Sequence, residues 1–548
     1  MNLPTPAVVA VRGAQRLPRF PLLLLCAAYI LPGLFGRDPW RQADLSSFGF
    51  MASIAQGHAP WWQPAIGGVP AEGGPLPYWI GALAIKALPF ADAAFAARLP
   101  FALILMLTLM LVWYSCFHLA CTEAAQPVAF AFGGEAQSID YARALSDGAL
   151  LALMATLGLL QLGHETTPEL LQLLASSLFL YGLAAAPFRP VKARWAALVS
   201  LPVLAASGAP IVAMVLAAIG AWLCNRSRYA PARALVKWLL LAGLLATVSA
   251  WEFNAWAWRI NTAAPVELSQ RMMNLLAWFT WPAGPLAAWT IWRWRSHWQR
   301  RHILLPLVCA LIPIVTSILM GGSDRALLLA LPALALLAAF ALPTLQRGFA
   351  AAIDWFSVFF FSAGALFFWV YYSSMQLGWP AVPLANLRRL ATGFQPHFNA
   401  LALFFAVLAT LAWLALVRWR TARHQHALWK SLVLPAGGVA LGWLLAMTLL
   451  LPPLDYARSN RPLVEQLQKT IPAHVDCIAT PDQALSTSAA LEFQGHWRVD
   501  GVHALAISPC SYALQSSQAQ IPEGWEKIAL VRRPTDRATG FAVLRRAR

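Results

Sequence analysis

Charged residues are scarce in this chain. Only 11% of its 548 residues are Asp, Glu, Lys or Arg, whereas 59% are hydrophobic. A soluble protein of this length needs far more charge to cover its surface, so the composition excludes an ordinary soluble enzyme. The excess apolar side chains must face lipid, and the 26 Trp residues suit the headgroup layer, where an indole ring keeps its N–H in water. We therefore expect a polytopic membrane protein.

Acidic residues are the rarer of the charged groups, with 23 Asp and Glu against 40 Lys and Arg and a net charge of +17. In a soluble chain this excess would favour a nucleic-acid partner. Here the basic residues gather in short loops between apolar runs, which is the pattern of cytoplasmic loops. We therefore expect membrane lipids and lipid phosphates as partners, and no nucleic acid.

The sequence also lacks the common cofactor motifs. It contains no P-loop, no dinucleotide fingerprint and no complete set of metal-ligand spacings. No small-residue cleavage site follows the first apolar run, so this run is expected to remain as a membrane anchor and not to be removed as a signal peptide.

Thirteen apolar runs approach the length of a membrane-spanning helix, which needs ~20 residues. The fifth and sixth are short and are separated by a Ser-Gly-Ala-Pro break, so they could instead form one long span or a re-entrant pair. The thirteen runs are 20–36, 98–119, 144–162, 170–187, 195–206, 209–224, 236–254, 274–293, 302–320, 325–343, 354–374, 399–418 and 430–451.

The distribution of basic residues predicts the orientation. Three Arg residues precede the first run, and the loops 189–194 and 226–237 are both basic. These loops should lie on the cytoplasmic side, which requires two crossings between them and favours separate fifth and sixth spans. With thirteen spans, the N-terminus is cytoplasmic and the C-terminal segment lies on the outer side.

We expect two domains. Residues 1–451 form the membrane domain, whose first outer loop, 37–97, is long enough to be functional and contains an apolar helix at the membrane surface. Residues 452–548 have balanced charge and short alternating apolar stretches, which predict a small α/β domain. Its two cysteines, Cys477 and Cys510, form either a disulfide or two separate buried thiols.

Acidic residues stand close to the outer ends of the predicted spans. Asp38 follows the first span in Gly-Arg-Asp-Pro-Trp-Arg-Gln-Ala-Asp, which ends at Asp44, and Glu72 begins Glu-Gly-Gly-Pro-Leu-Pro-Tyr-Trp. Ionisable groups at membrane depth are costly and need an explanation. Asp38 and Glu72 could act as a general base and its partner, or hold a divalent cation. The simpler alternatives are that Asp38 caps a helix and that Glu72 is solvated in a turn.

The order of these segments resembles a known family. A first span is followed by an acidic residue, a helix of small residues, a Trp pair, the Glu72 segment and an Arg98-Leu-Pro-Phe start to the next span. This order is similar to that of the GT-C glycosyltransferases of the aminoarabinose lipid A transferase and protein O-mannosyltransferase type. The break at 207–210 and the segment 324–332 resemble two further motifs of that family.

The resemblance implies an inverting glycosyltransferase. Such enzymes move a sugar from a polyprenyl-phosphate donor to a lipid or other envelope acceptor at the periplasmic face of the bacterial inner membrane. Asp38 matches the catalytic carboxylate, and Glu72 matches the acidic residue of the second motif. Asp147 resembles an Asp that helps to shape the site, and Arg325 stands where a cation can hold the lipid phosphate. A leaving phosphate needs such a cation more than a proton donor.

Other residues of the outer loops are candidates for substrate binding. His58 is close to Trp62, whose aromatic face suits a sugar ring, although anchoring at the interface is the simpler role. Arg259 and Arg271 could contact a lipid phosphate, although such side chains often only reach for the headgroups. No cofactor follows from the sequence, and a divalent cation stays open. The predicted substrate-binding residues are Asp44, Arg41, His58, Trp62, Asp147, Arg259, Arg271 and Arg325.

Two departures from the family pattern leave alternatives open. Trp40 stands in place of the second acid, and Gly73 stands where the family often has a Lys that would bind phosphate. A non-catalytic binder of lipid-linked sugars therefore remains an alternative, as does a ligase or polymerase of lipid-linked glycans. A polytopic transporter or flippase is a further alternative, although transporters often show internal repeats and none is evident here.

Overall fold

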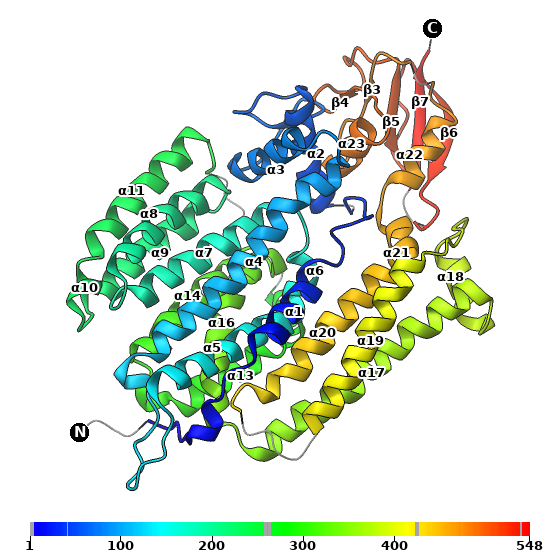
Figure 1. Cartoon of the computed structure of the whole chain (residues 1–548). Coiled ribbons are helices and arrows are strands. Elements are labelled where there is room, and N and C mark those ends of the chain that lie inside the picture. The colour runs from blue at the N-terminus through cyan, green and yellow to red at the C-terminus, as the bar shows by residue number, and fades with distance from the viewer. Residues whose placement is uncertain are drawn as a thin grey trace.

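The computed structural model confirms a predominantly helical, polytopic membrane architecture (Figure 1). Every one of the thirteen predicted runs overlaps a helix. The short helix Val11–Ala14 and α10 (Ala230–Arg233) lie at one end of the helices, while α18 (Ala381–Leu390) and the C-terminal strands lie at the other, here named the outer end. The structure describes residues 5–40, 42–256, 260, 265–421, 427–472, 474–536 and 540–547.

Seven helices in these ranges are long and apolar enough to cross a membrane. Shorter apolar helices, α1 (Arg19–Ile30), α9 (Pro210–Asn225) and Leu331–Thr344, which contains α16 (Leu331–Ala341), overlap three more of the predicted runs. The three runs that remain are 144–162, 195–206 and 274–293. They overlap α5 (Ser138–Ala155) with α6 (Leu157–Leu162), α8 (Pro190–Ala206) and α13 (Ala283–Arg293), respectively. The seven are α4 (Ala93–Ala120), α7 (Pro168–Ala185), Ala230–Glu252, which comprises α10 and α11 (Val236–Glu252), α14 (Arg301–Leu319), α17 (Arg347–Leu377), α19 (Ala400–Thr421) and α20 (Lys430–Thr448).

The boundaries of the helices follow Pro and Gly. The fifth and sixth runs form two separate helices in contact, α8 and α9, each with Pro as its first residue, where no backbone donor is needed. Gly208, between them, has φ of +96°, which a residue with a side chain rarely adopts. The first run is helical only to Ile30, six residues short of the predicted end, because Pro32 and the left-handed Gly33 follow.

Burial separates a central helix from two outer ones. All eleven residues of α16 are buried, and this helix contacts α4, α5, α13 and α14. By contrast, only 11% of the spanning windows of α17 and α19 are buried within the protein. Helices that are apolar all round but little covered by protein require lipid around them. The predicted membrane domain therefore has a protein-covered centre and a lipid-facing helix pair.

The first outer loop is folded onto the outer end of the bundle. It contains α2 (Ala43–Gln56), a two-stranded hairpin of β1 (Ala65–Ile66) and β2 (Val69–Pro70), and α3 (Leu76–Ala87), which matches the predicted surface helix. Further short helices are α12 (Pro265–Asn274), α15 (Asp324–Leu328) and α21 (Leu451–Arg458), which leads from the last span to the C-terminal part of the chain.

The C-terminal part has an α/β fold, as predicted. A mixed five-stranded sheet has the order β4-β3-β5-β7-β6, in which β3 is parallel to both neighbours and β7 is antiparallel to both of its own. The elements are α22 (Arg461–Gln468), β3 (Ile478–Ala479), α23 (Leu485–Phe493), β4 (Val499–Asp500), β5 (Tyr512–Ser516), β6 (Trp525–Arg532) and β7 (Gly540–Arg546).

A disulfide joins Cys477, just before β3, to Cys510, just before β5. We expect the Cys477→Ser/Cys510→Ser double variant to lose about 2–4 kcal/mol of stability, because the disulfide closes a loop with a sequence separation of 33 residues. The measurement is thermal unfolding in detergent with and without reductant. Reductant should lower the midpoint of the wild type and leave that of the double variant unchanged; equal midpoints for both proteins without reductant would contradict the prediction.

The C-terminal domain packs directly on the first outer loop. The rings of Phe48 in α2 and Phe493 in α23 meet edge to face at 4.6 Å. The Gly67 carbonyl in the β1–β2 turn accepts from Gly501 N at 2.8 Å, and Gly67 N donates to Glu492 Oε1 at 2.8 Å. The loop and the domain therefore form a continuous packed layer over the outer end of the bundle.

Glu492 is expected to make this contact sensitive to pH. Burial raises the pKa of Glu492 to about 7 from its ordinary value of 4.5, although the Gly67 N–H acts in the opposite direction. The folded protein thus holds this proton where the unfolded chain has lost it, so its contribution to stability is lost as pH rises through about 7. Thermal unfolding of wild type and Glu492→Gln from about pH 5 to about pH 8 measures this. The variant should show the weaker pH dependence, and identical profiles would exclude the effect.

Candidate active site

Charged side chains from distant parts of the sequence meet at the outer end of α1. They come from the segment after α1, from α2, from the start of α4, from the turn after α6, from α15 and from the α21–α22 junction. Hydrogen bonds, ion pairs and contacts with the Trp40 ring link most of them, and the charge of Asp44 acts on Glu165, which is paired with Arg325. We name this set the rim cluster; it comprises Arg37, Asp38, Asp44, Arg98, Glu165, Arg325, Asp455, Arg458 and Arg461.

The Asp38 carboxylate is held by the start of the C-terminal domain. Arg461 donates from Nε to Oδ2 at 2.8 Å and from Nη2 to Oδ1 at 2.6 Å, and Ser459 Oγ donates to Oδ2 at 2.8 Å. The Asp38 side chain is 14% exposed, whereas that of Arg461 is 57% exposed. Burial raises the pKa of Asp38, but the hydrogen bonds and charge of Arg461 outweigh burial, so this pKa lies below its ordinary value. Asp38 is therefore ionised at neutral pH.

Asp455 provides a second carboxylate beside Asp38. Its Oδ1 accepts from Asp38 N and from Trp40 Nε1, both at 3.0 Å. Burial and the negative charge of Asp38 raise the pKa of Asp455 to about 6, although the two hydrogen bonds act in the opposite direction. The two carboxylates thus have clearly separated pKa values, so Asp38 stays ionised in the pH range where Asp455 takes up a proton.

Asp44 is buried and engaged by the protein itself. It is 2% exposed, accepts from Thr166 N at 2.8 Å, from Thr166 Oγ1 at 2.9 Å and from Trp40 N at 3.1 Å, and lies 3.7 Å from Arg37 Nη2. Arg37 and Arg458 each lie 4.7 Å from the centre of the Trp40 ring. Trp40, which replaces an acid of the family pattern, is thus a packing centre between cations. Asp44 fixes the loop on which Asp38 and Trp40 lie.

Arg325 is paired with two carboxylates. Its Nη2 lies 2.7 Å from Glu165 Oε2, and its Nη1 lies 3.4 Å from Glu169 Oε2. Burial and the charge of Asp44 raise the pKa of Glu165, and Arg325 opposes them. The sequence resemblance implies that Arg325 holds the lipid phosphate. Such a phosphate would have to compete with both glutamates for the guanidinium.

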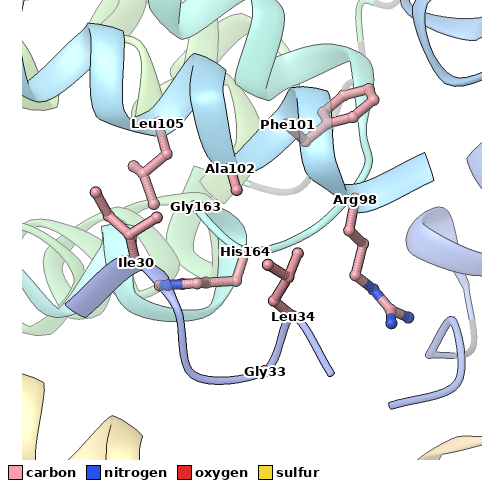
Figure 2. A pocket seen from close by; sticks show the side chains of 9 residues that line it. All are labelled: Ile30, Gly33, Leu34, Arg98, Phe101, Ala102, Leu105, Gly163 and His164. Atoms are coloured by element: carbon pink, nitrogen blue, oxygen red, sulfur yellow. The ribbon is translucent and has the colours of Figure 1, made fainter. Parts of the chain in front are cut away.

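A small cavity between α1 and α4 borders the rim cluster (Figure 2). Arg98 at its edge is 4% exposed and donates to the Arg37 carbonyl, but its Nε and Nη2 have no hydrogen-bond partner among the described residues. Figure 2 shows the guanidinium pointing away from the apolar end of the cavity. The lining residues are Ile30, Gly33, Leu34, Arg98, Phe101, Ala102, Leu105, Gly163 and His164.

Glu72 lies on the loop between β2 and α3, and its side chain is exposed. The glycines that follow it pack against the turn between α8 and α9. A side chain on Gly74 would lie 1.8 Å from the Ala206 carbonyl oxygen, and Gly73 has φ of +97°. Because only glycine adopts this φ readily, the backbone here disfavours the Lys of the family pattern. The Glu72 segment and the Ser-Gly-Ala-Pro break are therefore in contact, although they are far apart in the sequence.

Asp147 lies away from the rim cluster. Its Oδ1 accepts from Trp113 Nε1 and its Oδ2 from Leu17 N, both at 2.8 Å. Trp113 is fifteen residues beyond Arg98 on α4, which corresponds to about 22 Å along the helix. Asp147 thus anchors the segment before α1 at the opposite end of the bundle, because its carboxylate is taken up by a backbone N–H and an indole there.

The other predicted substrate-binding residues have no contact with the rim cluster that the described ranges reveal. His58 is exposed just after α2, and Trp62 is 75% exposed, with its ring 5.6 Å from that of Trp79. Arg271 donates to the Gly321 carbonyl at 3.2 Å and so ties α12 to the loop before α15. Arg41 and Arg259 lie outside the described residues.

The predicted site omitted the residues that surround Asp38. Asp455, Ser459, Arg458 and Arg461 follow the last span within about a dozen residues, just as Asp38 follows the first. The shared distance from a span end was the available signal, because such residues occupy the same membrane depth. Within the ranges that the structure describes, no three His, Cys, Asp or Glu side chains are grouped to hold a metal ion.

Comparison with known proteins shows the fold. No protein-family model and no curated protein match the chain. The chain is similar to the solved structure of ArnT from Cupriavidus metallidurans bound to undecaprenyl phosphate, with a TM-score of 0.61 and 14% identity over 96% of this chain and 97% of that one. The apo state of that ArnT gives a TM-score of 0.59 with the same identity and coverage. The chain therefore has a fold similar to that of ArnT, as the sequence resemblance predicts.

Proposed function

We propose that this protein is an inverting glycosyltransferase that moves a sugar from a polyprenyl-phosphate donor to a lipid or other envelope acceptor. The observation that carries the proposal is an ionised carboxylate, Asp38, held among arginines at the outer end of the membrane helices of an ArnT-like fold. The ArnT structure similar to this chain is bound to undecaprenyl phosphate, which supports a donor on a lipid phosphate carrier.

The reaction needs two things from the protein. The acceptor oxygen attacks the anomeric carbon from the face opposite the phosphate, and the bond from that carbon to the phosphate oxygen breaks. The electron pair leaves with the phosphate, so a cation is needed where this charge develops. Arg461 and Arg98, whose charges act on Asp38, and Arg458 on the Trp40 ring could meet this need, whereas Arg325 is already paired with two glutamates.

Asp38 fits the role of the base. A hydroxyl acceptor gives up its proton as its oxygen attacks, and an ionised carboxylate can take that proton, whereas a phosphate acceptor needs no base. Asp455 lies behind the Asp38 backbone N–H and orients the turn from Asp38 to Trp40. Glu72 remains the second predicted acid, and its loop forms the neighbouring part of the outer surface.

We further propose that the outer end faces the periplasm of a bacterial inner membrane. The basic loops and the N-terminus gather at the other end, which agrees with the bias of Lys and Arg toward the cytoplasm. The disulfide in the C-terminal domain agrees with an oxidising compartment.

Direct transfer tests the proposed function. The purified protein in detergent is mixed with a panel of labelled polyprenyl-phosphate sugars and an envelope lipid extract, beside the Glu72→Gln variant. Labelled product with wild type supports the enzyme, and its loss in Glu72→Gln assigns that residue to the site. Carrier binding without transfer for every donor would favour a non-catalytic binder or a flippase instead.

A further inference from the structure

Asp38 is largely taken up by the protein in the arrangement described above. Arg461 donates to both carboxylate oxygens and Ser459 adds a third hydrogen bond, so three of about four lone-pair positions are occupied. An acceptor hydroxyl that gives its proton to Asp38 has to compete with these donors. We therefore expect Asp38 to act as an efficient base only when Arg461 moves away.

Arg461 is the partner best able to move. More than half of its side chain is exposed, at 57%, whereas the Asp38 side chain is 14% exposed. Asp38 is also fixed through its backbone, since Asp38 N donates to Asp455 and Trp40 N donates to the buried Asp44. A change in this pair therefore swings the arginine and leaves the carboxylate in place.

Phosphate is the ligand that can replace the Asp38 carboxylate as the partner of Arg461. A guanidinium donates two parallel hydrogen bonds to phosphate with the same geometry as to a carboxylate, so one bidentate pair can replace the other. Arg461 begins α22 only a short distance after the last span, as Asp38 follows the first, and both therefore lie near headgroup depth. The phosphate group of a membrane lipid lies at this same depth, so it can reach Arg461.

We propose that Arg461 exchanges Asp38 for the phosphate of the isoprenoid lipid carrier, so that arrival of the donor frees the carboxylate. This inference rests on the proposed function and adds to it a phosphate-binding residue from the C-terminal domain. Once Arg461 leaves, Asp38 loses the group that chiefly holds its pKa down, and it becomes a stronger base when the donor is bound. Without a bound donor, Asp38 remains paired with Arg461.

Binding of undecaprenyl phosphate, which carries no sugar, tests the exchange separately from chemistry. Its dissociation constant is measured by calorimetry in detergent micelles for wild type, Arg461→Ala, Asp38→Asn and the double variant. We expect Arg461→Ala to bind about tenfold more weakly, because a charge-assisted pair is lost. Asp38→Asn should bind about tenfold more tightly, because the competing carboxylate charge is gone. The double variant should resemble Arg461→Ala.

A matched control is Arg545→Ala. Arg545 has a similarly exposed side chain, at 54%, and pairs with Glu526 on the sheet of the same domain. This variant should bind the lipid as wild type does. Thermal unfolding checks that each protein is folded, and Arg461→Lys, which keeps the charge but loses the fork, replaces Arg461→Ala if the latter does not fold.

The outcomes separate the exchange from the proposed function. Tighter binding by Asp38→Asn that disappears in the double variant supports the exchange. Unchanged or weaker binding by Asp38→Asn overturns it and leaves Arg461 as a residue that only positions Asp38, whether or not wild type transfers sugar. Absence of lipid binding by wild type overturns the exchange as well, and absence of transfer in the assay above then removes the proposed function with it.

Discussion

Replacing Asp38 by Asn is expected to lower sugar transfer by about 10²- to 10⁴-fold, the range for loss of a positioned general base. The substitution removes the negative charge but keeps the size of the side chain and its ability to accept from Arg461 or Ser459. The variant should therefore fold, and the loss should appear as a fall in turnover and not as weaker donor binding. Initial rates with saturating labelled donor measure this.

Asp500→Asn is a matched control for Asp38→Asn. Asp500 lies on β4, its side chain is 13% exposed, and its pKa is lowered because hydrogen bonds from Ser508, Val502 and His503 outweigh burial. Unlike Asp38, it is not bonded to an arginine or to any member of the rim cluster among the described residues. We expect this variant to transfer sugar at the wild-type rate. Equal rates for wild type and Asp38→Asn would remove Asp38 from the catalytic role.

Replacing Asp44 by Ala is expected to destabilise the protein by about 3–5 kcal/mol, the cost of breaking a buried ion pair. The change leaves Arg37, whose side chain is completely buried, with its charge uncompensated, and removes the acceptor of three hydrogen bonds from Thr166 and Trp40. Thermal unfolding in detergent measures the loss. A role in substrate contact alone would instead leave the unfolding midpoint near that of wild type.

A second substitution distinguishes charge from packing at Asp44. Removing both members of a buried ion pair is often far less costly than removing one. The Asp44→Ala/Arg37→Met double variant should therefore recover part of the lost stability. If it is less stable than Asp44→Ala, the contacts of Arg37 with the His164 carbonyl and the Trp40 ring stabilise the protein more than its unpaired charge destabilises it.

Hydropathy predicted the helices well because the property that it reads is local. A run of about twenty apolar residues must be helical in lipid, where each backbone group needs an internal partner, so all thirteen runs overlap helices. Hydropathy could not distinguish α16, which is buried in protein, from α19, which faces lipid. Both are apolar along their whole length, and only the packing of distant helices separates them.

The candidate site was predictable only in part, because its contacts join distant segments. Asp38 could be selected from its position after the first span, and the structure gives it a polar, charged environment at the outer end. The sequence paired it with Glu72, whereas the carboxylate that accepts from the Asp38 N–H is Asp455, which is 417 residues away in the chain. Asp147 was included by resemblance, but its partners Leu17 and Trp113 hold it at the other end of the bundle.

The distance along the chain between Asp38 and its partners has a consequence for biosynthesis. Asp38 and Arg461 are separated by 423 residues, so Asp38 leaves the ribosome on the order of tens of seconds before Arg461 is made. During that interval the first loop can insert and fold, but neither Ser459 nor Asp455 exists to surround it. A ribosome that stops within the membrane domain therefore releases an inserted chain that cannot form the rim cluster.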